Sequence, residues 1–304
     1  MADRPRLLLL NGQLVPYADA RVHILSTAFK YGAIVFEGLR AYWSESHRQL
    51  NGFRLGDHMQ RLARSMAATH MKLDRSADDL CDDLLRLIRA NDLREDLHMR
   101  VQAFVDEDDG KLASTAPISI AMAAIPMGRF FDKSLNVGVS TWVRISERSM
   151  PPRVKAAANY HNSRLALLEA KANGFDDAVL LTEGGKVSEG PGYNLFIVRG
   201  GELVTPPTTD SILEGVTRDS LIRIATEQLG LTVRERSIDR TELYAAQEMF
   251  FCGSSSEVTP IVSVDRHVLG TGKVGDVTRK LREAFLAIAR GDQPDERGWL
   301  QPVY

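Results

Sequence analysis

Lys155 is the residue whose setting first suggests chemistry. It lies between Val154 and the alanines at 156–158, and a lysine in so apolar a setting can be desolvated, which lowers its pKa and lets its amine act as nucleophile or base. Glu189 follows in a glycine-rich turn, and Thr217 stands where a helix is expected to begin. Free N–H groups at a helix start bind phosphate. A lysine, a carboxylate and such a helix start are what a pyridoxal phosphate site requires.

Several motifs surround these residues and follow one another in order along the chain. They are Tyr31-Gly-Ala-Ile-Val-Phe-Glu-Gly-Leu-Arg40, Lys155 with Asn159-Tyr160, Ser188-Glu-Gly-Pro-Gly-Tyr-Asn-Leu-Phe196, Gly215-Val-Thr-Arg-Asp219 and Glu257-Val-Thr-Pro260. In these motifs the chain resembles the class IV (fold type IV) pyridoxal-phosphate aminotransferases, and within them the branched-chain amino-acid aminotransferases. The similarity extends from about Asn11 to the C-terminal Gly-Trp-Leu-Gln-Pro-Val stretch. It specifies the family more closely than the substrate.

The resemblance implies a role for each residue around the cofactor ring. Lys155 is expected to form the internal Schiff base with the cofactor aldehyde, and its freed amine then moves the proton between the substrate α-carbon and the cofactor. Glu189 is expected to face the pyridine nitrogen and hold it protonated, so that the ring accepts electrons. Tyr160 is expected to donate a hydrogen bond to the phenolate oxygen.

The cofactor phosphate is expected at the start of the helix near Thr217, where backbone N–H groups and the helix dipole favour an anion. Val216 and Thr217 would provide N–H groups, and Thr217 a hydroxyl. Ser254, in the run 253–256, offers a further donor. Arg61 matches the family's phosphate-binding arginine by position. No metal ion is expected, because the histidines lack metal-ligand spacing.

The expected substrate pocket follows the branched-chain pattern at many positions and departs from it at others. The residues that agree with the pattern are Tyr31, Phe36, Gly38, Arg40 and Arg100. The resemblance implies that the two arginines are the cations for a substrate carboxylate.

The departures concern the polarity of the same pocket. His98 stands where the branched-chain enzymes usually have a tyrosine, so the hydroxyl that helps hold the substrate carboxylate in them is missing. The loop Asp106–Gly110 is far more acidic than the family's usual apolar, glycine-rich loop. If it overhangs the pocket it would repel a carboxylate, unless its side chains point to solvent. Ser255 and Ser256 replace a pair of alanines and make the pocket wall polar.

The leading interpretation is an enzyme that transaminates small amino acids, branched-chain L-amino acids foremost, with 2-oxoglutarate in a ping-pong reaction. A D-amino-acid or (R)-amine transaminase of the same fold is the alternative that His98, the acidic loop and the serine pair favour. A lyase resembling aminodeoxychorismate lyase is disfavoured by the stretch 36–40. A non-catalytic cofactor-binding protein is disfavoured by the intact Lys155 and Glu189.

The composition excludes several other classes of protein. The 304 residues carry a net charge of −2, so there is no basic excess that would bind nucleic acid. Cys81 and Cys252 lie far apart, which argues against a disulfide framework and for a reducing cytoplasm. No run approaches the ~20 apolar residues of a membrane span, and the N-terminus lacks the apolar core of a signal peptide. The resemblance implies at least a homodimer, because active sites of the family are built at a dimer interface.

The expected fold is mixed α/β, in the two-domain arrangement of fold type IV with the cofactor between the domains. We expect a smaller N-terminal α/β domain over residues 1–124, a linker over 125–136, and a larger cofactor-binding domain over 137–304. The local signals within these domains are a hairpin turn at Asn11-Gly12, a capping box at Ser76 and Asp79, and helix N-caps at Asp57 and Thr217.

Overall fold

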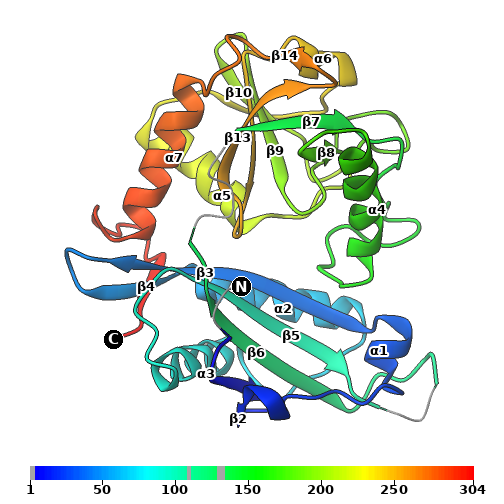
Figure 1. The fold of residues 1–304 in the computed structure, drawn as a ribbon, viewed down its shortest axis with the longest axis vertical. Coiled ribbons are helices and arrows are strands. Elements are labelled where there is room, and N and C mark those ends of the chain that lie inside the picture. The colour runs from blue at the N-terminus through cyan, green and yellow to red at the C-terminus, as the bar shows by residue number, and fades with distance from the viewer. Residues whose placement is uncertain (1–3, 108–110, 129–133) are drawn as a thin grey trace. The chain divides into compact units, whose positions relative to one another are not determined.

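The computed structural model describes residues 4–107, 111–128 and 134–304. It divides into two compact units, each with its own β-sheet (Figure 1). Unit 1 comprises Met1–Gly128, Val154–Ala158 and Ala287–Tyr304, and unit 2 comprises Arg129–Arg153 and Asn159–Leu286. The chain therefore returns to unit 1 twice, once with the short segment that carries Lys155 and once with its C-terminal end. The division expected at residues 125–136 does not provide for these returns.

The sheet of unit 1 has the strand order β15-β4-β3-β5-β6-β1-β2, with antiparallel neighbours throughout. Asn11 and Gly12 turn the β1–β2 hairpin with φ angles of 50° and 77°, which confirms the turn expected there. Strand β6 extends to Pro126, so the first two residues of the linker expected over 125–136 belong to the sheet. The strands are β1 (Leu7–Leu10), β2 (Gln13–Pro16), β3 (Ile34–Ser44), β4 (Gln49–Phe53), β5 (Leu97–Val105), β6 (Ile118–Pro126) and β15 (Leu300–Pro302).

Two amphipathic helices cover one face of this sheet. Helix α2 (Leu55–Ala68) packs against β3, and α3 (Ala77–Ala90) packs against β1 and β6. Their apolar sides join the sheet in one core that includes Leu39, Met59 and Leu84. The capping box expected at Ser76 and Asp79 begins α3 and is confirmed. A short 3₁₀ turn, η1 (Tyr17–Asp19), and helix α1 (Thr27–Tyr31) precede β3.

The start of α2 differs from the expectation. Asp57 is not the N-cap: the helix begins at Leu55, after Arg54 in the left-handed conformation. Asp57 lies in the first turn, where its carboxylate accepts a hydrogen bond from Arg54 Nε at 2.7 Å. An acidic residue is favoured both at the N-cap and in the first turn, because both positions meet the positive end of the helix dipole. Its presence therefore marks the helix start only to within about a turn.

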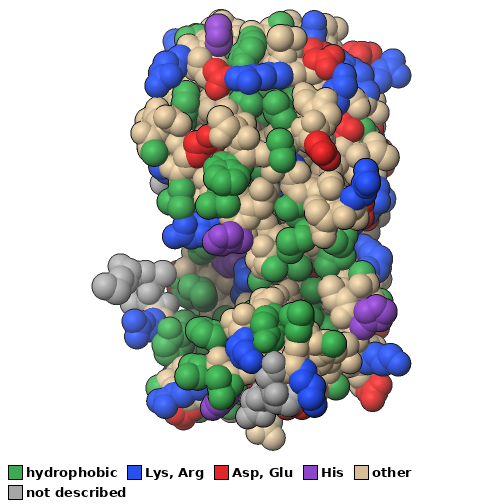
Figure 2. Space-filling model, turned by 90° about the vertical axis from the view of Figure 1, so that its right-hand side faces the viewer, with side chains coloured by type: hydrophobic (Ala, Val, Ile, Leu, Met, Phe, Trp, Pro, Cys, Tyr) green, Lys and Arg blue, Asp and Glu red, His purple; other side chains and the backbone are tan. Residues whose placement is uncertain are grey.

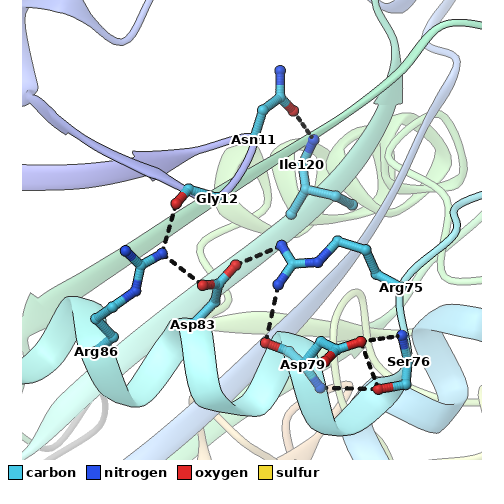
Figure 3. Close-up of polar contacts among 8 residues, drawn as sticks. All are labelled: Asn11, Gly12, Arg75, Ser76, Asp79, Asp83, Arg86 and Ile120. Atoms are coloured by element: carbon cyan, nitrogen blue, oxygen red, sulfur yellow. Dashed lines mark hydrogen bonds and ion pairs between the residues drawn. The ribbon is translucent and has the colours of Figure 1, made fainter.

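A polar network ties the β1–β2 hairpin to α3 (Figure 3). Asp83 of α3 is buried, and its carboxylate accepts hydrogen bonds from Arg75 and Arg86. Arg86 also donates to the carbonyl of Gly12 at 2.6 Å, and the Asn11 side chain accepts an N–H of β6 at 2.8 Å. Asp83 is thus a buried carboxylate held by two arginines at the hairpin end of unit 1.

The sheet of unit 2 has the strand order β11-β10-β9-β12-β13-β7-β8, and β14 pairs with β13. Helix α4 (Asn159–Ala172) packs against β7 and β8, and α5 (Val216–Arg223) packs against β12. The remaining helices are the π-helical turn η2 (Ile224–Gln228), α6 (Arg240–Tyr244) and α7 (Asp276–Ala289). The strands are β7 (Leu135–Val139), β8 (Asp177–Val179), β9 (Asn194–Arg199), β10 (Glu202–Thr205), β11 (Val233–Glu235), β12 (Glu248–Gly253), β13 (Glu257–Val264) and β14 (His267–Val268).

Both units combine a sheet with helices, which confirms the mixed α/β class. Within the described ranges no helix has the length and apolar character that crossing a membrane requires.

Candidate active site

The segment that carries Lys155 completes the edge of β3 in unit 1. The Phe36 N–H donates to the Lys155 carbonyl at 2.9 Å, the Ala157 N–H donates to the Ile34 carbonyl at 2.9 Å, and Ala156 bridges to Val35. The Lys155 N–H donates to Ser65 Oγ of α2 at 3.2 Å. Lys155 is 9% exposed. Strand-like pairing on one side and a helix on the other therefore fix the backbone of a buried lysine.

One face of the sheet beside Lys155 carries most of the expected substrate residues. Phe36, Gly38 and Arg40 alternate along β3 and so share a face. Their partners in register on β5 are Gln102, Arg100 and His98. The sheet thus brings together the expected Phe36, Gly38, Arg40, His98 and Arg100.

Two cationic side chains of this region, Arg100 and Lys155, lie against the ring of Phe36. The guanidinium carbon of Arg100 lies 3.5 Å from the centroid of the Phe36 ring, and Lys155 Nζ lies 4.9 Å from it. Arg100 Nε also donates to Gln102 Oε1 at 3.3 Å. The guanidinium is therefore oriented by a ring face and by an amide.

His98 fills part of the space that Gly38 leaves. A Cβ atom on Gly38 would lie 3.4 Å from His98 Nε2. Burial lowers the pKa of His98 to about 4, and the positive charges of Arg40, Arg100 and Lys155 contribute to the shift. His98 is therefore a neutral imidazole at neutral pH, and the positive charge of this face comes from the two arginines and the lysine.

The opposite face of β3 carries a buried ionic cluster. Glu37 points toward α2, where it accepts hydrogen bonds from Arg61 Nε and Nη2 and from His58 Nδ1, each at 2.7 Å. Burial raises the pKa of Glu37, but the charge of Arg61 and the hydrogen bonds of Arg61 and His58 outweigh it and hold that pKa well below its ordinary value. Burial also lowers the pKa of His58. The expected phosphate-binding Arg61 is thus an ion-pair partner of Glu37.

In unit 2, Glu189 is a buried carboxylate with several hydrogen-bond and ion-pair partners. Its Oε1 pairs with Arg144 at 2.7 Å, and its Oε2 accepts from Asn194 Nδ2 at 2.9 Å and from the Leu213 N–H at 3.1 Å. Charge pairing and N–H donors stabilise the ionised form of a carboxyl group. Glu189 is therefore held as an anion, which is the form that can keep a pyridine nitrogen protonated.

Asn194 links Glu189 to the start of α5. Its Nδ2 also donates to the Leu213 carbonyl at 2.9 Å, and a Cβ on Gly215 would lie 1.9 Å from Asn194 Oδ1. Only glycine fits there, and Gly215 is the N-cap of α5. The expected cap Thr217 is wrong: it is the second helical residue, because the close approach of Asn194 places the helix start at Gly215.

The start of α5 and the turn after β12 have the features of an anion site. No side chain of the described residues caps α5, and Val216 and Thr217 in its first turn are buried. Ser256 Oγ is also buried and lacks a hydrogen-bond partner in the part of the chain that the structure describes. A helix start without a side-chain cap and a buried hydroxyl with unused hydrogen-bonding capacity fit a bound phosphate.

Glycines bring the remaining expected residues of unit 2 close together. A Cβ on Gly192 would lie 3.8 Å from Tyr160 Cε1, and a Cβ on Gly253 would lie 3.6 Å from the Gly192 carbonyl and 3.3 Å from Ser256 Oγ. Ser254 and Ser255 belong to the same turn between β12 and β13. Unit 2 therefore collects an anionic Glu189, a tyrosine and a phosphate-type helix start, and this set fits a phosphorylated pyridine cofactor.

Tyr31 and the acidic loop are not part of strands β3 and β5. Tyr31 is the last residue of α1 and is 44% exposed, and its ring centroid lies 5.0 Å from Lys30 Nζ. In the acidic loop, Asp106 accepts a hydrogen bond from Ser119 Oγ at 2.8 Å, and the carbonyl of Glu107 accepts from Thr27. The other acidic residues of the loop, at 108 and 109, lie outside the described residues.

Sequence reasoning missed several residues that hold the expected ones in place. They are Glu37 and His58, which bind Arg61, Gln102, which binds Arg100, and Arg144 and Asn194, which bind Glu189. Side chains alternate along β3, so Glu37 lies on the face opposite to that of Phe36. This alternation is a sequence signal that could have placed Glu37 in the buried layer. The partner of Glu189 has no such signal, since Arg144 is remote in the sequence and lies beyond the end of β7 at Val139.

Comparison with known proteins gives matches across both units. Residues 34–264 match the family model for amino-transferase class IV. The probable branched-chain-amino-acid aminotransferase of Aquifex aeolicus (strain VF5) is 38% identical over 298 residues, which cover 97% of this chain and 96% of the relative. A branched-chain aminotransferase structure from Thermoproteus uzoniensis with norvaline has 41% identity and a TM-score of 0.94, covering 98% and 99% of the two chains. One from Thermobaculum terrenum in its PLP form has 40% identity and a TM-score of 0.94, covering 99% of each.

Proposed function

The chain belongs to the class IV amino-transferases, and we propose that it transfers amino groups between branched-chain L-amino acids and 2-oxoglutarate. It is a pyridoxal-phosphate-dependent transaminase, which takes a small-molecule amino donor and a keto-acid acceptor. The observation that carries the choice of substrates is the face of β3 and β5, which holds Arg40 and Arg100, with Arg100 and the buried Lys155 against the Phe36 ring.

When bound, pyridoxal phosphate supplies a ring that withdraws electrons from the substrate α-carbon. Lys155 would hold the cofactor through its amine and would move the proton at the substrate α-carbon. Glu189, fixed as an anion by Arg144 and Asn194, keeps the proton on the ring nitrogen. Tyr160 would donate to the ring hydroxyl oxygen. Arg61, Val216, Thr217 and Ser254 would hold the phosphate.

The substrate residues divide into charged and neutral groups. Arg40 and Arg100 are the cations for substrate carboxylates, and a dicarboxylate such as 2-oxoglutarate can use both. His98, a neutral imidazole, adds polarity without charge. Phe36 and Gly38 are the neutral residues of β3, with Arg100 against the Phe36 ring and His98 beside Gly38. Tyr31, Ser255 and Ser256 complete the proposed set.

Borohydride reduction of the holoenzyme, followed by peptide mapping, tests the cofactor anchor. The label is expected on the peptide that contains Lys155, and a label on any other lysine would refute the assignment. Half-reactions with L-leucine, L-glutamate, D-alanine and (R)-1-phenylethylamine, each followed by cofactor absorbance, test the substrate. The two L-amino acids are expected to react fastest. Faster reaction of the (R)-amine or the D-amino acid would show that His98 and the serine pair, rather than the arginines, decide specificity.

We further propose a homodimer, which an exposed apolar patch supports. The patch is defined by Val22, Ile24, Leu25 and Phe29, and Ile24 and Phe29 are 67% and 72% exposed in the single chain. Large apolar side chains gathered this way mark an interaction surface; Figure 2 shows one face of the molecule with hydrophobic side chains at the surface beside lysines and arginines. Sedimentation velocity is expected to give a dimer, and Phe29→Asp to shift it toward monomer. A monomeric wild type at micromolar concentration would refute the proposal.

A cytoplasmic location is also proposed. Cys81 and Cys252 are buried free thiols, and free thiols suit a reducing compartment. Fractionation of cells with an antibody against the chain tests this location, and recovery outside the cytoplasm would contradict it.

A further inference from the structure

Glu37 is a fully buried carboxylate to which the proposed mechanism gives no role. Its exposure is 0%, yet it is ionised, because two hydrogen bonds from Arg61 and one from His58 replace the water it has lost. A carboxylate accepts only, so Nδ1 of His58 carries the proton it donates. A buried charge of this kind is costly unless it is fully paired. The cluster therefore ties Glu37, Arg61 and His58 into one arrangement.

The contacts fix the orientation of Arg61. Glu37 binds the Nε and Nη2 atoms of the guanidinium side-on, with both distances at 2.7 Å. A guanidinium is a planar fork, and a two-point contact on one edge fixes its plane and its direction. Glu37 therefore determines the direction in which the Nη1–Nη2 end of Arg61 points.

The same helix face meets the anchor lysine. His58, Arg61 and Ser65 are spaced three and four residues apart in α2 and so lie on one face. Ser65 Oγ accepts a hydrogen bond from the Lys155 N–H at 3.2 Å. The positive charge of Lys155 is also one of the causes that lower the pKa of His58, after burial. The helix face that holds the oriented guanidinium is thus the face against which the Lys155 segment packs.

We propose that Glu37 is a positioning residue for the cofactor phosphate and that it acts through Arg61. The inference rests on the proposed function in one respect, namely that Arg61 takes the phosphate. Glu37 itself touches neither cofactor nor substrate. It offsets the desolvation cost of burying Arg61 and fixes the orientation of the guanidinium. Phosphate binding then does not have to include the entropy cost of ordering this side chain.

The test compares pyridoxal phosphate with pyridoxal, which lacks the phosphate but has the same aldehyde. Each is titrated into full-length protein depleted of cofactor, and the dissociation constant is read from the absorbance of the bound cofactor. The ratio of the two constants isolates the phosphate, because bonding to Lys155 is common to both. Glu37→Gln is expected to weaken pyridoxal phosphate binding about tenfold, as for a lost charge-assisted contact, and to change pyridoxal binding less than twofold.

Asp83→Asn is the matched control. Asp83 is also a buried carboxylate held by two arginines in unit 1 (Figure 3), so this variant reproduces the loss of a buried charge without touching Arg61. Its ratio is expected to equal that of the wild type. Arg61→Lys is expected to shift the ratio in the same direction as Glu37→Gln, and the double variant is expected to lose no more than Arg61→Lys alone, because both act through one contact.

The outcomes separate the two proposals. If Arg61→Lys leaves the ratio unchanged, the phosphate role of Arg61 fails. If Arg61→Lys shifts the ratio and Glu37→Gln does not, or tightens pyridoxal phosphate binding, the positioning role of Glu37 is overturned while the proposed function stands. If Glu37→Gln does not fold, His58→Asn, which removes only the third hydrogen bond, is expected to shift the ratio two- to threefold in the same direction, and an unchanged ratio would overturn the inference.

Discussion

The guanidinium of Arg100 lies against the ring of Phe36, 3.5 Å from its centroid. Arg61, on the other side of the same sheet, is instead held by the carboxylate of Glu37. The two guanidinium groups are thus oriented by different contacts, one by the face of a ring and the other by a buried carboxylate. The first contact makes Phe36 the residue whose removal should disturb Arg100.

Phe36→Leu should weaken the binding of dicarboxylates through this contact. A desolvated cation–π contact contributes roughly 0.5–2 kcal/mol, so the KM for 2-oxoglutarate is expected to rise by about 2- to 30-fold. The kcat should change less, because Arg100 does not move a proton. Phe53→Leu, which removes a buried ring from β4 of the same sheet, is the control for lost packing. An equal change of KM in both variants would show that Phe36 acts only through stability.

Glu189→Gln should slow proton transfer while the cofactor stays bound. A neutral amide cannot hold the ring nitrogen protonated, and its N–H₂ would face Arg144 or Asn194, which are themselves donors. The half-reaction with L-leucine is expected to slow by about 10²–10⁴, measured by stopped-flow absorbance. Glu183→Gln, at an exposed turn glutamate, should react like the wild type. A wild-type rate in Glu189→Gln would mean that this carboxylate does not face the ring.

The part of the site that the sequence predicted consists of residues close together in motifs. Side chains alternate between the two faces of a strand, so Phe36, Gly38 and Arg40 share a face whichever strands pair with theirs. The glycine-rich turn around Glu189 can be recognised from the local sequence alone. Both are present in the structure. The position of Lys155 in unit 1 was not predictable in this way. It depends on hydrogen bonds from the 154–158 segment to β3, which are tertiary and leave no periodic signal.

The partners that fix the site were not predictable for the same reason. No local pattern around Arg144 points to Glu189: β7 ends at Val139, and the chain beyond it places Arg144 against Glu189. The prediction that Thr217 is the N-cap was wrong because the contact between Asn194 and Gly215 places the helix start at Gly215. Local propensity yields to tertiary contact in each case.

The pH dependence of 2-oxoglutarate binding tests whether His98 is neutral. Its pKa is lowered to about 4 by burial and by Arg40, Arg100 and Lys155, so it stays uncharged as the pH falls from 8 to 5.5. The ratio of kcat/KM between wild type and His98→Asn is therefore expected to be constant over this range. Taking a ratio cancels the ionisation of the substrate and of groups common to both proteins. A bend in the ratio near pH 6.5 would show that His98 acquires a charge and that its environment is wetter than the structure indicates.

Asp177 gives a pH dependence of stability that is separate from the reaction. It is buried at the start of β8, and burial raises its pKa to about 6 from 3.8. A raised pKa means that the folded state holds the proton more tightly. The stabilisation from that proton is fully present below the ordinary pKa and is lost as the pH rises through 6. Asp177→Asn keeps an oxygen that can accept the Ala178 N–H and removes the charge, so it should be more stable than the wild type at pH 8. The shift of about two pKa units bounds the gain at about 3 kcal/mol.

Urea unfolding of wild type and Asp177→Asn between pH 4 and pH 8 measures this difference. The gap in free energy of unfolding is expected to shrink as the pH falls through 6 and to be smallest near pH 4, where the wild-type carboxyl is itself neutral. Asp74→Asn, at an exposed position, controls for the change in net charge. A gap that is independent of pH, or one that widens toward acid, would mean that Asp177 is ionised in the folded protein and has a charged partner, so the raised pKa would be wrong.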